Sequence, residues 1–151
     1  FFLPAVAAAL LLAAPAFAQE HPEHPREHPK AKMEEKALTP AELADAIEAY
    51  IEDDADLKGG YFLIYDSTDK KPLALTLDKV HRDKLASIGN GVYFACTDMK
   101  ATDGTTYDLD FFMVEDEEEA LQTTDVSVHK KEGKPRYGWN EENGTWKKVA
   151  P

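Results

Sequence analysis

The residues with the clearest capacity for chemistry are three histidines in a proline-rich stretch near the start of the chain. Residues 19–30 read QEHPEHPREHPK, so the unit Glu-His-Pro occurs three times and spaces His21, His24 and His28 closely. Cleavage before Gln19 would leave an amine, two amides and the imidazole of His21 as four nitrogens in one plane. Such ligation suits Cu(II) or Ni(II), and His24 and His28 could add weaker imidazole sites. The stretch is therefore a candidate Cu or Ni site.

The same stretch can also be a plain spacer. Cyclisation of Gln19 would remove the amine ligand, and proline stiffens the chain against wrapping around one ion. Repeated proline favours an extended, polyproline-like backbone, and residues 19–30 offer no apolar side chain to bury apart from the prolines. We favour a solvated leader and keep metal capture as the alternative.

A second set of candidates lies on strands expected in the second half of the chain. Alternation could bring polar side chains together on one sheet face: Thr97, Asp108, Asp110, Asp125, Ser127 and His129. Carboxylates beside an imidazole can bind a cation or transfer protons. Any water-facing sheet surface shows the same alternation, so a solvated face is the simpler interpretation. From this set Asp108, Asp110 and His129 are the candidate ligand-binding residues.

Aromatic residues near the end of the chain form a third set. Tyr137, Trp139 and Trp146 lie in one expected hairpin, close to the basic residues Arg136 and Lys148. Exposed aromatic residues beside arginine are typical of binding surfaces, and Tyr137 and Trp139 are our candidates for ligand contacts. The two tryptophans could equally close the end of the core. The register of the hairpin decides whether they share a face, and the sequence leaves that open.

One helix and a series of hairpins must position these candidates. Thr39-Pro40-Ala41-Glu42 is a capping box, with Thr39 as the N-cap and Glu42 at the third helical position. Apolar residues then recur at helical spacing on one face: Leu43, Ile47, Tyr50 and Ile51. Gly59-Gly60 is expected to end the helix after Leu57.

The rest of the chain reads as short strands separated by turns. We expect strands at 61–65, 73–77, 92–99, 105–114, 121–130, 136–140 and 145–149. Residues 80–91 are expected to continue a strand and add a short helical turn. Turn signals lie at Asp103-Gly104, Glu132-Gly133 and Asn143-Gly144. Residues 38–150 are therefore predicted to form a single α+β domain, with one N-terminal helix packed on an antiparallel meander β-sheet.

The hairpin at Asp103-Gly104 determines which side chains share a face. A two-residue turn there places Cys96 opposite Phe111 and Phe94 opposite Met113. The core face would then carry the apolar residues of both strands: Val92, Phe94, Cys96, Leu109, Phe111 and Met113. Cys96 is the only cysteine, so no internal disulfide can form. We expect its thiol to act as a small buried apolar group.

The start of the chain and its charge predict where the protein works. Residues 1–18 are uncharged and end in Ala16-Phe17-Ala18, the small-x-small pattern of a signal peptide. A membrane anchor is the competing interpretation, which Pro4 and Pro15 disfavour. We expect a signal peptide at 1–18, a flexible His/Pro-rich leader at 19–37, and a periplasmic or secreted protein. The net charge of −12 repels phosphates and anionic lipids, so we expect neither a nucleic-acid partner nor membrane insertion after signal cleavage.

The capped helix, the segment Gly59-Gly60-Tyr61 and the following strand–turn–strand resemble small exported modules of the PepSY-like and cystatin-like type. This resemblance implies a binding or inhibitory module outside the cytoplasm. Because no nucleophile–base pair can be identified, we expect a non-enzymatic module that binds a protein, peptide or small ligand. The alternative is a periplasmic protein that binds Cu(II) or Ni(II) through its leader.

Overall fold

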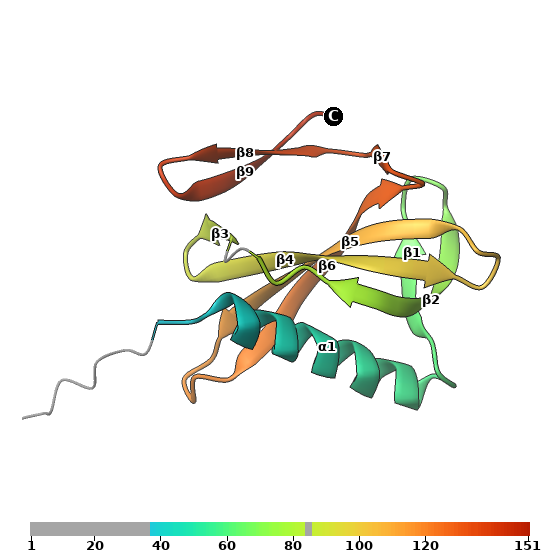
Figure 1. Ribbon diagram of the computed structural model, residues 1–151, viewed down its shortest axis with the longest axis horizontal. Coiled ribbons are helices and arrows are strands. Elements are labelled where there is room, and N and C mark those ends of the chain that lie inside the picture. Colours follow the sequence, from blue (N-terminus) through green and yellow to red (C-terminus); the bar gives the residue numbers. More distant parts are fainter. Residues whose placement is uncertain (1–36, 84–85) are drawn as a thin grey trace, which may run out of the picture. The chain divides into compact units, whose positions relative to one another are not determined.

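The computed structural model describes residues 37–83 and 86–151, and within them the chain forms one helix and a curled antiparallel sheet of meander-like strands (Figure 1). The predicted signal peptide, almost all of the leader, and the candidate ligands His21, His24 and His28 lie outside the described residues. The elements in chain order are α1 (Pro40–Leu57), β1 (Phe62–Asp66), β2 (Lys71–Val80), β3 (Ala86–Gly89), β4 (Val92–Ala101), β5 (Thr106–Glu115), β6 (Leu121–Lys131), β7 (Lys134–Pro135), β8 (Gly138–Glu142) and β9 (Thr145–Val149).

Helix α1 begins and ends where the sequence predicts. The Thr39 side chain accepts a hydrogen bond from the Glu42 amide, and the Glu42 carboxylate accepts one from the Thr39 amide, which completes the capping box. The helix runs from Pro40 to Leu57 and buries three of its four predicted apolar residues: Leu43, Ile47 and Ile51. The fourth, Tyr50, is partly exposed but sets its ring edge-on against Phe62 and Phe111.

The strands form two sheets, and the smaller one is the C-terminal hairpin. The larger has the order β1-β2-β4-β5-β6-β7, with β3 paired on β4, and the smaller is the hairpin β8–β9. The described residues of the range 80–91 contain no helical turn, and residues 86–89 form strand β3 instead. In Figure 1, α1 lies on one side of the larger sheet and β8–β9 on the other. The main core lies on the helix side, and a second cluster around Phe94 and Phe112 lies on the hairpin side.

Two of the predicted turns are two-residue hairpin turns. Glu132-Gly133 joins β6 to β7, and Asn143-Gly144 joins β8 to β9, with positive φ at both residues of each pair. Positive φ at both central residues is the geometry that matches the twist of paired strands. The second turn pairs Glu141 with Trp146 and Trp139 with Lys148. Trp139 and Trp146 therefore share a face, which the sequence had left open.

The turn between β4 and β5 differs from the prediction and changes the register. Ala101 pairs with Thr105 across a loop of Thr102, Asp103 and Gly104, so the loop has three residues rather than two. Gly104 has a φ of +89°, the left-handed conformation that closes a three-residue hairpin loop at low cost for glycine. Cys96 consequently pairs with Asp110, and Ala95 pairs with Phe111.

A register shift of one residue moves every side chain of β4 to the other face. Ala95 and Thr97 belong to the helix side, where both are buried, and Thr97 donates its hydroxyl proton to the Leu109 carbonyl. The expectation that Thr97 joins the polar face was therefore wrong. The expectation that Cys96 lies in the main core was also wrong, because Cys96 faces the C-terminal hairpin and is only partly buried.

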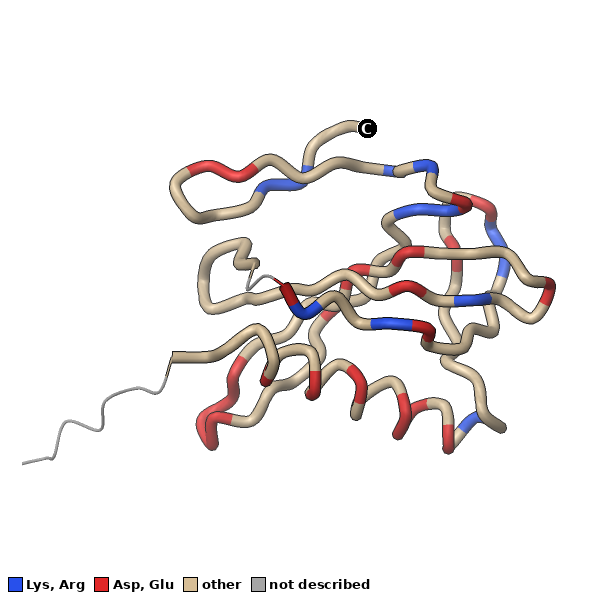
Figure 2. Tube along the Cα trace, viewed as in Figure 1, with Lys and Arg blue, Asp and Glu red and all other residues tan. Residues whose placement is uncertain are grey.

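The outer face of α1 is strongly acidic. Figure 2 shows acidic residues along the whole helix, whose last turn contains no basic residue. The apolar face of the helix is turned to the sheet, so these carboxylates are on the solvent side. Across residues 37–83 and 86–151, no helix combines the length and apolar character needed to cross a membrane.

Candidate functional site

A buried carboxylate, Asp110, organises the face beneath the C-terminal hairpin. Its side chain is fully buried on β5, and its Oδ2 atom accepts hydrogen bonds from the Tyr137 hydroxyl at 2.7 Å and the Trp139 indole at 2.8 Å. Burial alone would raise the pKa of Asp110, but hydrogen bonds from His129, Tyr137 and Trp139 hold it below its ordinary value. Asp110 is therefore an ionised group that attaches the hairpin to the sheet.

His129 lies at a β-bulge of β6, two residues after Ser127, which pairs with Asp110. Asp108 pairs with Lys130 and Leu109 with Val128, which leaves His129 as the extra residue of β6. Bulges are frequent beside functional sites. The imidazole stacks on the Tyr137 ring with centroids 4.6 Å apart. On this face Lys148 also lies over Tyr137, with Nζ 4.0 Å from the ring centroid.

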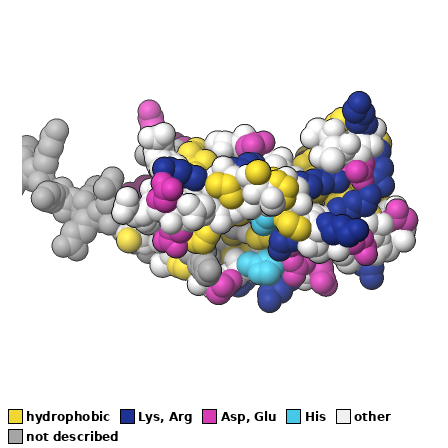
Figure 3. Space-filling view, turned by 90° about the horizontal axis from the view of Figure 1, so that it is seen from above, with side chains coloured by type: hydrophobic (Ala, Val, Ile, Leu, Met, Phe, Trp, Pro, Cys, Tyr) yellow, Lys and Arg dark blue, Asp and Glu magenta, His cyan; other side chains and the backbone are white. Residues whose placement is uncertain are grey.

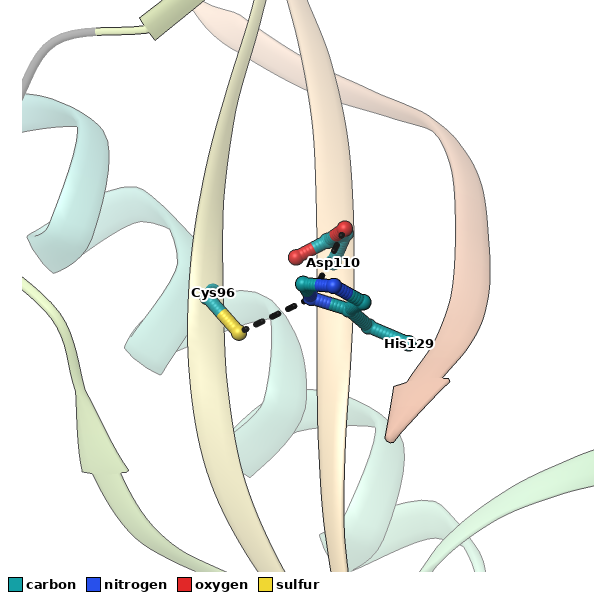
Figure 4. Close-up of side chains that lie close together, drawn as sticks. All are labelled: Cys96, Asp110 and His129. Carbon is teal, nitrogen blue, oxygen red and sulfur yellow. Dashed lines mark hydrogen bonds and ion pairs between the residues drawn. The ribbon is translucent and has the colours of Figure 1, made fainter. Parts of the chain in front are cut away.

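Cys96 completes a group of three potential ligand atoms. Its Sγ atom lies 3.9 Å from Nδ1 of His129, and Oδ2 of Asp110 lies 3.5 Å from the same nitrogen. Figure 4 shows both dashed lines meeting at that nitrogen, while the other Asp110 oxygen points toward the sulfur side. Burial and the neighbouring Asp110 carboxylate raise the pKa of the Cys96 thiol, so the thiol is protonated in this arrangement.

This arrangement differs from a catalytic triad. In a triad the nucleophile contacts one imidazole nitrogen and the acid orients the ring through the other. Here the sulfur and the carboxylate both approach Nδ1. A raised thiol pKa also disfavours the thiolate that nucleophilic chemistry requires. The three groups therefore surround one point, as metal ligands do. They do not form the chain of hydrogen bonds that a proton relay needs.

A cleft opens between the C-terminal hairpin and the sheet. Its volume is about 190 Å³, and its lining includes the apolar residues Ala86, Phe94, Trp139 and Trp146 and the polar residues His81, Asp83 and Cys96. Trp139 stacks on Phe94 with centroids 4.3 Å apart, and Trp146 meets the same ring edge-on at 6.4 Å. Figure 3, which views the hairpin side, shows histidine side chains beside exposed apolar ones.

Four of the predicted ligand-binding residues come together at this site: Asp110, His129, Tyr137 and Trp139. Asp108, the fifth of these predicted residues, lies two residues before Asp110 on β5. It does not join the cluster but forms an ion pair with Lys130 at 2.7 Å. The prediction missed Cys96 and His81, which line the cleft. Cys96 was missed because Asp103-Gly104 was taken as a two-residue turn, whereas the loop Thr102–Gly104 has three residues.

No protein-family model, curated protein or solved structure matches this chain. The resemblance to PepSY-like and cystatin-like modules therefore stays a prediction.

Proposed function

We propose that this protein is an exported binding module that holds a small aromatic or apolar ligand in the cleft between β8–β9 and the sheet. The observation that carries the proposal is the pair of tryptophans that share one face of the hairpin and pack around Phe94. Apolar walls with few polar groups are typical of small-molecule sites. The signal-like segment 1–18 supports a periplasmic or secreted setting.

The size of the cleft limits the ligand. A volume of about 190 Å³ is slightly larger than the roughly 150 Å³ cavity that accommodates one benzene ring in an engineered protein core. The ligand group that enters is therefore a single ring or a comparably short apolar chain. Larger molecules would extend past the mouth of the cleft.

The charge around the cleft selects the sign of the ligand. Asp83 lines the cleft, and His81 beside it contacts Asp98 at 2.8 Å. The whole chain carries a net charge of −12. These carboxylates repel anions and attract cations. We infer a neutral or cationic ligand.

Benzylamine and benzoate test both features, because they share one ring and differ in charge. We expect benzylamine to shift the NMR signals of both tryptophan indole groups and of Cys96, with a dissociation constant of about 1 mM, typical for so few atoms. Benzoate should bind several-fold more weakly. Trp146→Ala removes one wall of the cleft and should weaken benzylamine binding about tenfold.

Tyr65→Ala is the matched control, because Tyr65 is an exposed aromatic residue on the distant strand β1. This variant should bind benzylamine as the unchanged protein does. Shifts centred on Leu63 and Tyr65, or unchanged affinity in Trp146→Ala, would contradict the proposed function.

A further inference from the structure

We propose that Cys96, Asp110 and His129 form a binding site for a single Zn²⁺ ion. The three residues come from adjacent strands β4, β5 and β6, and their ligand atoms all lie within 4.8 Å of one another. They supply one sulfur, one oxygen and one nitrogen atom. The inference does not depend on the proposed ligand in the cleft.

The three ligand atoms lie close together but farther apart than around a bound tetrahedral ion. Ligand atoms about 2.0–2.3 Å from tetrahedral Zn²⁺ lie about 3.4–3.6 Å from each other. Nδ1 of His129 lies 3.9 Å from Cys96 Sγ and 3.5 Å from the Asp110 carboxylate, measured to Oδ2, and the three ligand atoms all lie within 4.8 Å of one another. Binding would draw these atoms together, and a rotation of the Cys96 side chain, which faces the cleft, is one movement that shortens its distance to Nδ1.

The carboxylate is already oriented for a ligand. Tyr137 and Trp139 donate hydrogen bonds to Oδ2 of Asp110, as outer groups around metal sites do. The other oxygen, Oδ1, is buried and has no hydrogen-bond partner among the residues that the structure describes. A buried acceptor without a partner is costly. A cation beside Oδ1 would satisfy it.

The donor set selects the class of metal. Ca²⁺ and Mg²⁺ prefer oxygen ligands throughout, whereas Zn²⁺ takes cysteine, histidine and carboxylate together. Three protein ligands leave the fourth coordination position of the ion for another ligand. Because Cys96 lines the cleft, solvent can reach that position. On binding, the S–H bond of Cys96 breaks, its proton passes to solvent, and the sulfur bonds to the ion.

Co²⁺ provides a specific probe, because a cobalt–thiolate bond gives a charge-transfer band and Cys96 is the only cysteine. The full chain, freed of metal with a chelator, should develop this band with an endpoint at one equivalent of Co²⁺. Adding Zn²⁺ should remove the band by displacement. The histidines of the leader cannot produce it, since the band requires sulfur.

Cys96→Ala should show no band. His129→Gln should bind Co²⁺ at least tenfold more weakly, as measured by titration of the band. Circular dichroism should show that both variants are folded. His81→Ala removes a nearby imidazole outside the site and should keep the band. Trp146→Ala should also keep the band while binding benzylamine about tenfold more weakly, which separates this proposal from the proposed function. Absence of the band in the folded full chain, an endpoint at half an equivalent, or an unchanged band in His129→Gln would overturn the inference.

Discussion

Ala95→Asp should lower the free energy of unfolding by about 4 kcal/mol or more, because it places an unpaired carboxylate in the main core. Ala95 is 6% exposed and belongs to the cluster between α1 and the sheet. It pairs with Phe111, which is fully buried. Urea denaturation followed by circular dichroism measures the loss, and a variant that is unfolded without urea satisfies the same expectation.

Cys96→Ser is the matched control on the next residue of β4. Cys96 faces the C-terminal hairpin and is only partly buried, so this exchange should cost less than about 1 kcal/mol. The two-residue turn would give the opposite order, with Ala95 on the outer face and Cys96 in the core. A well-tolerated Ala95→Asp together with a strongly destabilised Cys96→Ser would contradict the register described above.

Arg136→Met should destabilise the protein by about 3–5 kcal/mol at neutral pH, since it leaves a buried charge without its partner. Asp66 is fully buried at the end of β1, and Arg136 donates to both of its carboxylate oxygens. The amides of Thr68 and Asp69 donate to the same carboxylate at 3.0 and 3.2 Å. This contact ties the β1–β2 turn to the segment that enters the C-terminal hairpin.

The effect of Arg136→Met should shrink in acid. Burial alone would raise the pKa of Asp66, but Arg136 and the two amides hold it below its ordinary value of 3.8. A lowered carboxylate pKa contributes stability that is present above the unfolded pKa and is lost as the pH falls through the folded pKa. The stability difference between the unchanged protein and Arg136→Met should therefore be largest above about pH 4 and decline below it.

Lys131→Met controls for loss of one positive charge. Lys131 pairs with Asp69 at the exposed surface, where an ion pair contributes about 0.2–1 kcal/mol. Denaturation curves of both variants at about pH 3 and about pH 7, below and above the ordinary pKa of an aspartate, provide the comparison. An equal, small loss in the two variants would show that the Asp66–Arg136 pair does not support the fold.

Features that depend on neighbouring residues could be predicted from the sequence. The capping box at Thr39–Glu42 and the glycines after Leu57 fix α1 through contacts a few residues apart. Asn143-Gly144 fixes the β8–β9 hairpin because both residues must adopt positive φ. The broad α+β architecture follows from these local signals.

The register of β4 on β5 could not be predicted in the same way. Asp103-Gly104 fits both a two-residue and a three-residue loop, and the choice between them inverts one strand. The alternation of β5 placed Asp108 and Asp110 on the correct face, but β4 was reversed. Cys96 was therefore assigned to the core and missed as a member of the site.

Contacts between distant residues were also beyond the sequence. Arg136 and Asp66 are separated by 70 positions, and neither residue carries a local signal for the other. Alternation within β6 placed His129 on the face of Asp110, but the bulge that leaves His129 unpaired arises from the pairing of β5 with β6. The sequence therefore predicted the polar residues of the sheet and the aromatic residues of the hairpin as two separate sets, and the structure shows them at one site.

Backbone NOEs between β4 and β5 in the full chain measure the register on which the site depends. Cross-strand NOEs should pair Cys96 with Asp110 and Ala95 with Phe111. With that pairing, the thiol lies beneath the C-terminal hairpin beside His129 and the cleft. NOEs that instead pair Cys96 with Phe111 would place the thiol under α1, and both the cleft described here and the proposed Zn²⁺ site would be wrong.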